Sequence, residues 1–227
     1  MAKIKTTRLE IIRCAASMFM ERGFSSTAPK AISDALDISA GNLTYYFPTK
    51  EHLLAQLVDM LCEFQWRLME EEAAEGYSSL MAICLELTSM AAACEADSVA
   101  KDFFLSSYSN AIPLEIIRKN DKARAKKVFG QYCKDWTDEQ FAEAEILVSG
   151  IEFATLFTTG ESVPLETRIA GALDTILGIY NVPADVRKLK IAKSLAMDYR
   201  GLGVRILTEF REYVHNTTEQ AIRELFK

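Results

Sequence analysis

One stretch decides the fold of the first part of this 227-residue chain: Ile38-Ser39-Ala40-Gly41-Asn42-Leu43-Thr44-Tyr45-Tyr46-Phe47-Pro48-Thr49-Lys50. Ser39 is a good helix cap, and Pro48 ends a helix because it cannot continue the hydrogen-bond ladder. Leu43 and Phe47 are four residues apart, so both point inward from the short helix between these signals. Its outer face is left with hydroxyl, amide and phenol groups, which suit phosphates and base edges.

Two more helices are predicted before this stretch. The first begins at a capping box formed by Thr7 and Glu10 and ends at Gly23, which adopts a left-handed conformation at little cost. Residues 25–27 supply the cap of the second helix, and Pro29 is tolerated in its first turn because no N–H is needed there. Its buried side is expected to consist of Ile32, Ala35 and Leu36.

A tight turn at Asp37 connects the second helix to the third. Two short helices joined by such a turn form a helix-turn-helix when the outer face of the second helix is polar. That second helix enters the major groove of DNA with its N-terminal residues against the base edges. The sequence therefore predicts a three-helix DNA-binding domain at residues 1–50.

The outer residues of the third helix suit different DNA contacts. Gly41 lets the backbone approach the DNA, Asn42 can make a bidentate contact to adenine, and Thr44 can contact a thymine methyl group or a phosphate. Tyr45 and Tyr46 suit phosphate oxygens, although one of them could instead pack into the small core. The predicted DNA-binding residues are Thr27, Ser39, Ala40, Gly41, Asn42, Thr44, Tyr45, Tyr46 and Lys50.

The charge of the chain is unevenly distributed. Residues 1–50 hold seven basic and four acidic side chains, a net charge of +3, whereas the whole chain carries −6. Residues 51–227 therefore carry −9. This distribution favours an N-terminal head that binds a polyanion and a C-terminal body that does not contact nucleic acid.

The N-terminal part of the chain resembles the DNA-binding domain of TetR-family transcriptional regulators. The resemblance covers residues 7–58 and rests on the order of several motifs: Phe19-Met20-Glu21-Arg22-Gly23-Phe24, Ser26-Thr27, Ile32-Ser33, Ile38-Ser39-Ala40-Gly41-Asn42-Leu43 and Tyr45-Tyr46-Phe47-Pro48-Thr49-Lys50-Glu51-His52-Leu53-Leu54. It implies an all-helical, two-domain homodimer. Such a protein binds a palindromic operator in double-stranded DNA, and a small-molecule effector in its C-terminal domain releases it.

Three positions depart from the usual family pattern. Asp37 stands at a turn position that is usually glycine, but aspartate can also adopt the left-handed conformation. Thr44 stands where tyrosine is most common, which leaves the individual DNA contacts open. Pro29 replaces a β-branched residue, which affects how the second helix approaches the DNA backbone.

The rest of the chain, residues 51–227, reads as a larger helical domain for effector binding and dimerisation. A helix starting near residue 50 carries a long apolar stripe to about residue 68, so it joins the head to the body without a flexible linker. Further helices are expected at about 98–119, where Pro113 kinks or breaks the helix, at 122–132 and at 183–215. No stretch shows strand-like alternation, and the predicted fold class is all-α.

Two helices of the body, at about 138–159 and 165–180, are candidates for the dimer interface. Both leave small apolar residues on their surface, which permit close helix approach. Paired helices across a two-fold axis are also what the family resemblance implies. Ordinary packing within one chain is the alternative explanation.

The effector site is expected among helices at about 78–160. Aromatic residues there could line a cavity, with Glu152 or Tyr108 as the polar group. The same aromatic residues could equally be ordinary core. The candidate effector-binding residues are Phe103, Phe104, Tyr108, Trp136, Glu152, Phe153 and Phe157.

Other classes of protein fit the sequence less well. The chain has two histidines and lacks a glycine-rich phosphate loop or metal-binding motif, so we expect neither an enzyme nor a cofactor or metal. No long apolar run or secretion signal is present, so we expect a cytoplasmic protein without a membrane span. The alternatives to a repressor are a DNA-bound protein with a division or nucleoid role and a helical protein-interaction module.

Overall fold

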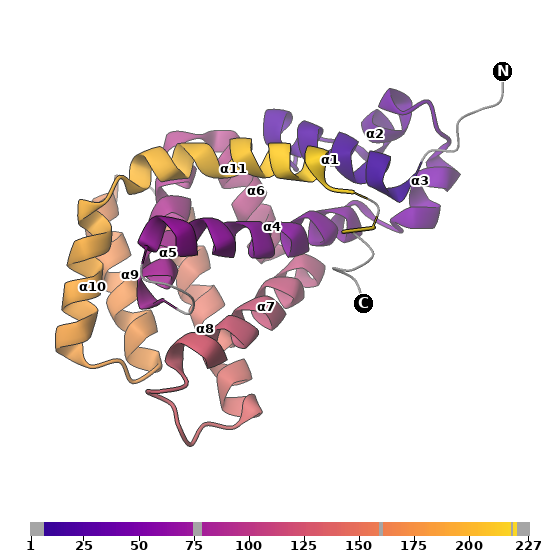
Figure 1. Cartoon of the computed structure of the whole chain (residues 1–227). Helices are drawn as coiled ribbons and strands as arrows, with labels where there is room; N and C mark the ends of the chain where they lie inside the picture. The colour runs from indigo at the N-terminus through magenta and orange to yellow at the C-terminus, as the bar shows by residue number, and fades with distance from the viewer. Residues whose placement is uncertain (1–6, 75–78, 159–160, 219, 222–227) are drawn as a thin grey trace.

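The computed structural model describes residues 7–74, 79–158, 161–218 and 220–221, and every regular element within these ranges is a helix (Figure 1). The predicted all-α fold is thereby confirmed. The helices are α1 (Arg8–Arg22), α2 (Pro29–Ala35), α3 (Ala40–Tyr46), α4 (Lys50–Ala73), α5 (Leu80–Ala96), α6 (Ser98–Ser109), α7 (Ala111–Phe129), α8 (Asp138–Phe157), α9 (Leu165–Ile179), α10 (Ala184–Ala196) and α11 (Tyr199–Asn216).

The head consists of α1, α2 and α3, and its local signals act largely as predicted. Thr7 and Glu10 form the capping box of α1, and Gly23 ends that helix with φ of 88°. Asp37 takes the left-handed conformation in the turn, with φ of 50°. The Ser39 hydroxyl accepts a hydrogen bond from the Asn42 N–H at 3.1 Å and so caps α3.

The start of α2 differs from the prediction. Its N-cap is Ala28, which offers no side-chain hydrogen bond, while Pro29 takes the first helical position as expected. The buried side of α2 is also different, because Ile32 and Ser33 are buried whereas Ala35 is exposed. The Ser33 hydroxyl donates to the Lys30 carbonyl at 2.9 Å, which lets a polar side chain occupy a buried position.

The long helix α4 runs from the head into the body (Figure 1). The apolar residues of α4 are buried both in the head and in the body, and Leu54 and Leu57 are fully buried. The helix ends at Ala74, which takes a left-handed conformation with φ of 52°. A second connection supports the head, because α1 packs against α6 and α11 as well as α4. The head is therefore held to the body in two ways, by the continuous helix α4 and by the contacts of α1 with α6 and α11.

The body is built around α5, which packs against α4, α6, α8, α9, α10 and α11. Two predictions in this region are wrong. The basic segment 122–132 is no separate helix, because α7 runs unbroken to Phe129 and the break lies earlier, at Asn110. The stretch 183–215 is two helices, because Asp198 begins α11 by accepting a hydrogen bond from the Gly201 N–H at 2.9 Å.

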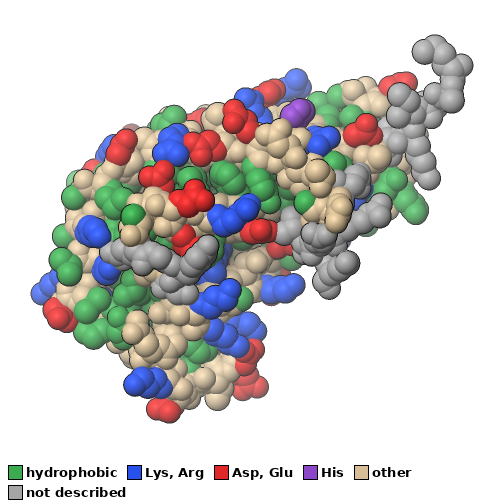
Figure 2. All heavy atoms as spheres, viewed as in Figure 1, with side chains coloured by type: hydrophobic (Ala, Val, Ile, Leu, Met, Phe, Trp, Pro, Cys, Tyr) green, Lys and Arg blue, Asp and Glu red, His purple; other side chains and the backbone are tan. Residues whose placement is uncertain are grey.

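The surface of the body mixes charges of both signs. Figure 2 shows acidic and basic side chains interspersed over the face that it presents. In the part of the chain that the structure describes, no helix is both long and apolar enough to cross a membrane.

Candidate DNA-binding surface and effector pocket

The outer face of α3 lies at the end of the head. Ser39, Ala40, Gly41, Thr44 and Tyr45 are exposed, and Asn42 and Tyr46 are partly exposed. Leu43 and Phe47 are buried beneath them, as predicted from their spacing. The structure therefore brings the predicted α3 residues together on one surface.

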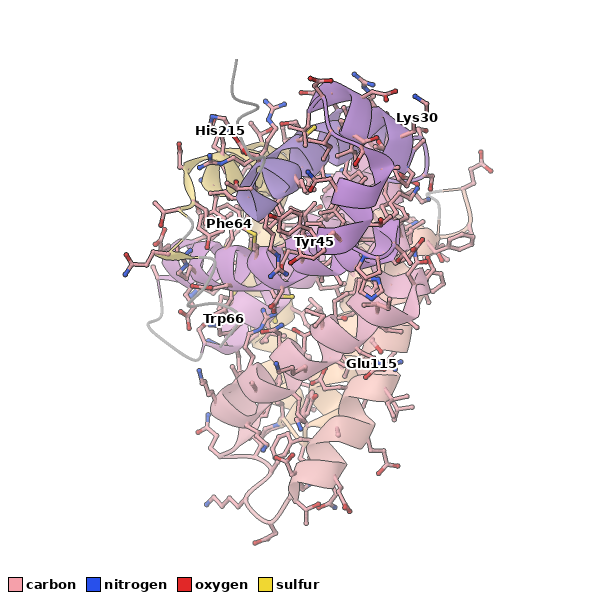
Figure 3. All side chains as sticks on the ribbon, turned by 90° about the vertical axis from the view of Figure 1, so that its right-hand side faces the viewer. Lys30, Tyr45, Phe64, Trp66, Glu115 and His215 are labelled. Carbon is pink, nitrogen blue, oxygen red and sulfur yellow. The ribbon has the colours of Figure 1, made fainter. Side chains whose placement is uncertain are left out.

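The two tyrosines of α3 occupy different environments. Tyr45 is 81% exposed although it is a large aromatic residue, and Figure 3 shows it on the head end of the molecule. Tyr46 packs partly against the core, and its ring meets that of Tyr45 edge-on with centroids 5.1 Å apart. Tyr45 is thus the tyrosine that is free to reach a partner, and Tyr46 supports it.

Two other predicted DNA-binding residues are engaged within the head. Thr27 is buried, and its hydroxyl donates to the Gly23 carbonyl at 2.7 Å. In this conformation Thr27 closes the loop between α1 and α2 and does not present its hydroxyl to a phosphate. The Lys50 ammonium donates to the Phe24 carbonyl at 2.8 Å and lies 4.0 Å from the centroid of the Phe24 ring.

The centre of the body holds a layer of charged side chains, which we call the Arg124 layer and define as Glu86, Asp121, Arg124, Glu145 and Glu152. Arg124 and Glu145 are buried, and the other three are partly buried. The Arg124 guanidinium is bound by Glu86 at 3.0 Å and Asp121 at 2.6 Å. It also lies 5.0 Å from the ring centroid of Trp66, which Figure 3 labels below α4.

Tyrosines hold the other two carboxylates of this layer. The Tyr108 hydroxyl donates to Glu152 at 2.9 Å, and the Tyr180 hydroxyl donates to Glu145. The Tyr180 ring is stacked on Phe129 with centroids 4.1 Å apart, so its position is fixed by packing.

Burial changes the protonation of the layer. It raises the pKa of Asp121 to about 7, against the lowering effect of Arg124. It also raises the pKa of Glu145 to about 8, with repulsion from Asp121 as the next cause. The pKa of Glu152 is raised well above its ordinary value for the same two reasons. These raised pKa values favour the uncharged form of the carboxyl groups in the layer.

Two small cavities, each of about 30 Å³, flank the Arg124 layer. Glu86, Asp121 and Arg124 line both of them. One cavity is also lined by Glu145, Glu152 and the apolar residues Ile83, Leu87, Val148, Leu173 and Ile176. The other is also lined by Gln65, Phe104, Ser107 and Tyr108. Polar groups and apolar walls thus meet at one place in the body, as in small-molecule sites.

The predicted effector residues divide into three groups. Tyr108 and Glu152 lie at the Arg124 layer, and Phe104 lines one of its cavities. Phe103 is fully buried core, and Trp136 packs on Phe141 at 5.2 Å between ring centroids. Phe153 and Phe157 stack on each other away from these cavities, and Phe157 is 59% exposed.

Sequence reasoning missed Arg124, Glu86, Asp121, Glu145 and Tyr180. A signal for two members of the layer was present, because Glu145 and Glu152 fall on the same helical face as Phe141 and Val148. A charged residue on an apolar stripe is buried with the stripe, and it then needs a partner. Of these two, only Glu152 was among the residues predicted for the effector site.

The outer face of α8 exposes large apolar side chains, whereas that of α9 exposes small and polar residues. Ile146 is 55% exposed and Leu147 is 56% exposed. Gly150 on α8 and Gly171 on α9 are exposed, and a Cβ added at either would meet nothing within 4 Å. Val148, Thr155 and Leu173 of the same two helices are buried.

Comparison with known proteins assigns the head to a family. Residues 11–57 match the family model described as bacterial regulatory proteins, tetR family. This chain carries a TetR-family DNA-binding domain. Within that TetR-family segment lie most of α1, all of α2 and α3, and the start of α4.

Two curated relatives share part of the chain. The HTH-type transcriptional repressor KstR2 of Mycobacterium tuberculosis is 34% identical over 56 residues, which are 25% of this chain and 28% of that protein. The probable HTH-type transcriptional regulator YttP of Bacillus subtilis is 30% identical over 69 residues, which are 30% of this chain and 33% of that protein. The matches thus span no more than about a third of either relative.

Solved structures are similar over more of the chain but at lower identity. A complex of SmeT with triclosan covers 77% of this chain and 94% of its own, with 14% identity and a TM-score of 0.48. A gamma-butyrolactone receptor described as ArpA-like covers 89% of this chain and 96% of its own, with 20% identity and a TM-score of 0.43. At these TM-scores no ligand or operator is transferred to this chain.

Proposed function

We propose that this protein is a homodimeric, sequence-specific DNA-binding regulator, and that it represses transcription until a small-molecule effector releases it from a palindromic operator. The observation that carries the proposal is the exposed outer face of α3 on a TetR-family head. The relative KstR2 is a transcriptional repressor, which supports repression as the sign of regulation. In this proposal residues 1–50 bind DNA in the cytoplasm, and residues 51–227 bind the effector and dimerise.

The proposed DNA contacts follow from the solvent exposure of the side chains on α3. Asn42, near the N-terminus of α3, is the candidate for a base contact, because N-terminal residues of a recognition helix face the base edges. Tyr45 is the candidate for a phosphate contact, since its hydroxyl is exposed and a phosphate oxygen accepts its hydrogen bond. Ser39, Ala40, Gly41 and Thr44 complete the surface.

The proposed dimer forms through the exposed faces of α8 and α9. Leu147 and Ile146 supply apolar area that water would otherwise cover, and Gly150 and Gly171 permit close helix approach. A dimer suits the proposed function because one recognition helix gives little affinity. Two heads can read half-sites about 34 Å apart, one turn of DNA.

The proposed mechanism is a shift of population between two arrangements of the heads. The effector binds one arrangement more tightly and thereby depletes the arrangement that fits the operator. The helix α4 is the first candidate to carry this change, because it runs from the head into the body. The helix α6 is a second candidate, because Asp102 contacts the head and Tyr108 contacts the Arg124 layer.

Fluorescence anisotropy on a labelled duplex from the upstream intergenic region of the gene tests the proposal. Asn42→Ala and Tyr45→Ala should each weaken binding by roughly tenfold or more, as expected for a lost base or phosphate contact. Leu189→Ala is the matched control, because Leu189 is 67% exposed on α10, at the opposite end of the molecule (Figure 1).

Two results would contradict the proposal. Equal, steeply salt-dependent binding to a scrambled duplex would indicate a general DNA anchor, such as a nucleoid or division protein. Binding to no duplex, with the fold intact by circular dichroism, would favour a helical protein-interaction module.

A further inference from the structure

The helix α11 reaches from one of the two helices of the proposed dimer face to the DNA-binding head. At its start, the Tyr199 hydroxyl and the Arg200 guanidinium both donate to one oxygen of Glu166 on α9, each at 2.7 Å. At its other end α11 packs against α1 of the head, and Figure 1 shows these two helices side by side. One continuous helix therefore connects α9 with the head.

Arg13 on α1 binds the C-terminal end of α11. Its guanidinium donates through Nη2 to the Thr217 carbonyl at 2.7 Å. Thr217 is the residue that ends α11, and the carbonyl groups at the end of a helix carry a partial negative charge that favours a nearby cation. A cation of the head thus caps a helix of the body.

The acceptor of this hydrogen bond is held in place by further contacts. The N–H and the hydroxyl of Thr217 both donate to the Tyr213 carbonyl, at 3.0 and 2.8 Å. The Tyr213 ring packs against Phe64 of α4, with ring centroids 5.4 Å apart. The Thr217 carbonyl is therefore presented to Arg13 at a defined place on the body.

The environment of Arg13 favours a role in geometry. Within the described part of the chain, its Nε is buried and has no hydrogen-bond acceptor. A buried donor without an acceptor lowers stability, so an apolar side chain would suit this place better if stability alone mattered. Keeping a polar group at such a cost is one way in which proteins specify a single arrangement of packed elements.

A second contact between the same two helices limits their relative angle. Arg211 on α11 pairs with Glu21 on α1 at 3.3 Å. Glu21 follows Arg13 by eight residues, which is about 12 Å along the axis of α1. Two contacts this far apart oppose rotation of α1 about either one. The pair of Arg211 and Glu21 is largely exposed and therefore weak, so most of the restraint falls on Arg13.

The body end of α11 has little room to slide. Gly203 lies so close to α5 that a Cβ there would be 2.6 Å from the Ser89 carbonyl oxygen. Arg205 pairs with Glu72 of α4 at 2.9 Å. A fixed helix of the body thus serves as the support on which the head is oriented.

We propose that Arg13 is a positioning residue for DNA recognition: its bond to the end of α11 fixes the angle between head and body, and thereby selects the separation of half-sites that the dimer binds. The inference rests on the proposed function, since this separation has meaning only for a dimer with two DNA-binding heads. Arg13 acts through α11 and needs no contact with the DNA.

Duplexes that differ only in half-site separation test this role. The operator from the upstream region is compared with duplexes that have one base pair inserted or removed between the half-sites. Each change alters the separation by about 3.4 Å and the relative rotation by roughly a tenth of a turn. Fluorescence anisotropy gives the affinity of the full-length protein for each duplex. The spacing preference is the ratio of the affinity for the operator to that for an altered duplex.

Arg13→Met keeps the aliphatic stem and removes the guanidinium, and it should lower the spacing preference roughly threefold or more. The lost positive charge weakens binding to every duplex alike, so it cancels in the ratio. Arg22→Met is the matched control, because it removes the same charge at an exposed position of the same helix. Arg13→Lys keeps a cation and a donor, and it should retain more of the preference than Arg13→Met.

Arg211→Met provides a second test at a position where folding is not at risk, because its ion pair is largely exposed. This variant should lower the spacing preference less than Arg13→Met does, and the double variant should lower it most. Circular dichroism verifies that each protein is folded. Hydrogen exchange should quicken at residues 211–217 in Arg13→Met and stay unchanged in Arg22→Met.

The positioning role is overturned if Arg13→Met and Arg211→Met keep the wild-type spacing preference, if Arg22→Met lowers it as much, or if the wild-type protein binds all spacings equally. A wild-type protein that binds no duplex would instead contradict the proposed function itself. Because the wild-type protein is measured first, these two failures are told apart before any variant is compared.

Discussion

The Asp102 carboxylate on α6 accepts hydrogen bonds from both the backbone N–H of Ser25, at 2.9 Å, and the Ser25 hydroxyl. Ser25 lies just beyond the end of α1, in the loop that leads to α2. Six residues along α6, Tyr108 binds Glu152 of the Arg124 layer. One short helix therefore contacts the head near its start and the candidate effector site near its end.

We expect Asp102→Ala to loosen the head from the body. The variant loses two charge-assisted hydrogen bonds at a partly exposed site, which should lower the free energy of unfolding by about 1–2 kcal/mol. Urea denaturation measures the loss, and hydrogen exchange should quicken at residues 23–27. The exposed acid Glu212 on α11 provides the control, Glu212→Ala, and equal effects of the two changes would refute the linkage.

Gly23→Ala should destabilise the head for two separable reasons. The backbone at Gly23 has φ of 88° and ψ of 153°, a conformation that costs other residues about 1–3 kcal/mol. A Cβ there would also lie 2.6 Å from Oδ2 of Asp102. In a double-mutant cycle with Asp102→Ala, the steric part should disappear and the backbone part should remain. Strict additivity would show that the contact plays no role.

Leu147→Glu should dissociate the proposed dimer. The side chain is 56% exposed on the face of α8 assigned to the interface, and a carboxylate facing its own copy across a two-fold axis is repelled. Analytical ultracentrifugation should show monomers for Leu147→Glu and dimers for the control Leu189→Glu. If both variants remain dimeric, another face forms the interface.

The free energy of unfolding should fall as the pH rises from about 5 to 8. The pKa of Glu145 is raised to about 8 in the folded protein, whereas an unfolded glutamate titrates near 4.3. Between these values the folded state holds a proton that the unfolded state has lost, so stability decreases with pH. Urea denaturation across this range should show a flatter dependence for Glu145→Gln. An unchanged slope in that variant would exclude Glu145 as a source.

Local signals in the head could be predicted because each acts over a few residues. The Thr7 capping box, the Gly23 stop and the Ser39 cap depend on adjacent backbone groups, and the structure contains all three. Thr27 could not be placed in the same way. Its hydroxyl serves as an internal donor to Gly23, a role that depends on how the loop closes.

The body was harder to predict because its decisive contacts join distant segments. Glu145 was not predicted as part of a site, because its partner Tyr180, just after the end of α9, is 35 residues away in the chain. Arg124 likewise appeared to belong to a short basic helix, since its partner Glu86 is 38 residues away. The boundaries of the two domains stay a prediction.

The contact of Lys50 with Phe24 has a consequence for the spacing of half-sites in an operator. This ammonium fastens the first turn of α4 to the loop after α1 and thereby stiffens the head. A rigid head on each protomer of the proposed dimer leaves the distance and angle between heads as the adjustable quantities. One extra base pair between half-sites adds about 3.4 Å and roughly a tenth of a turn. Such an insertion should therefore weaken binding more than a single base change within a half-site.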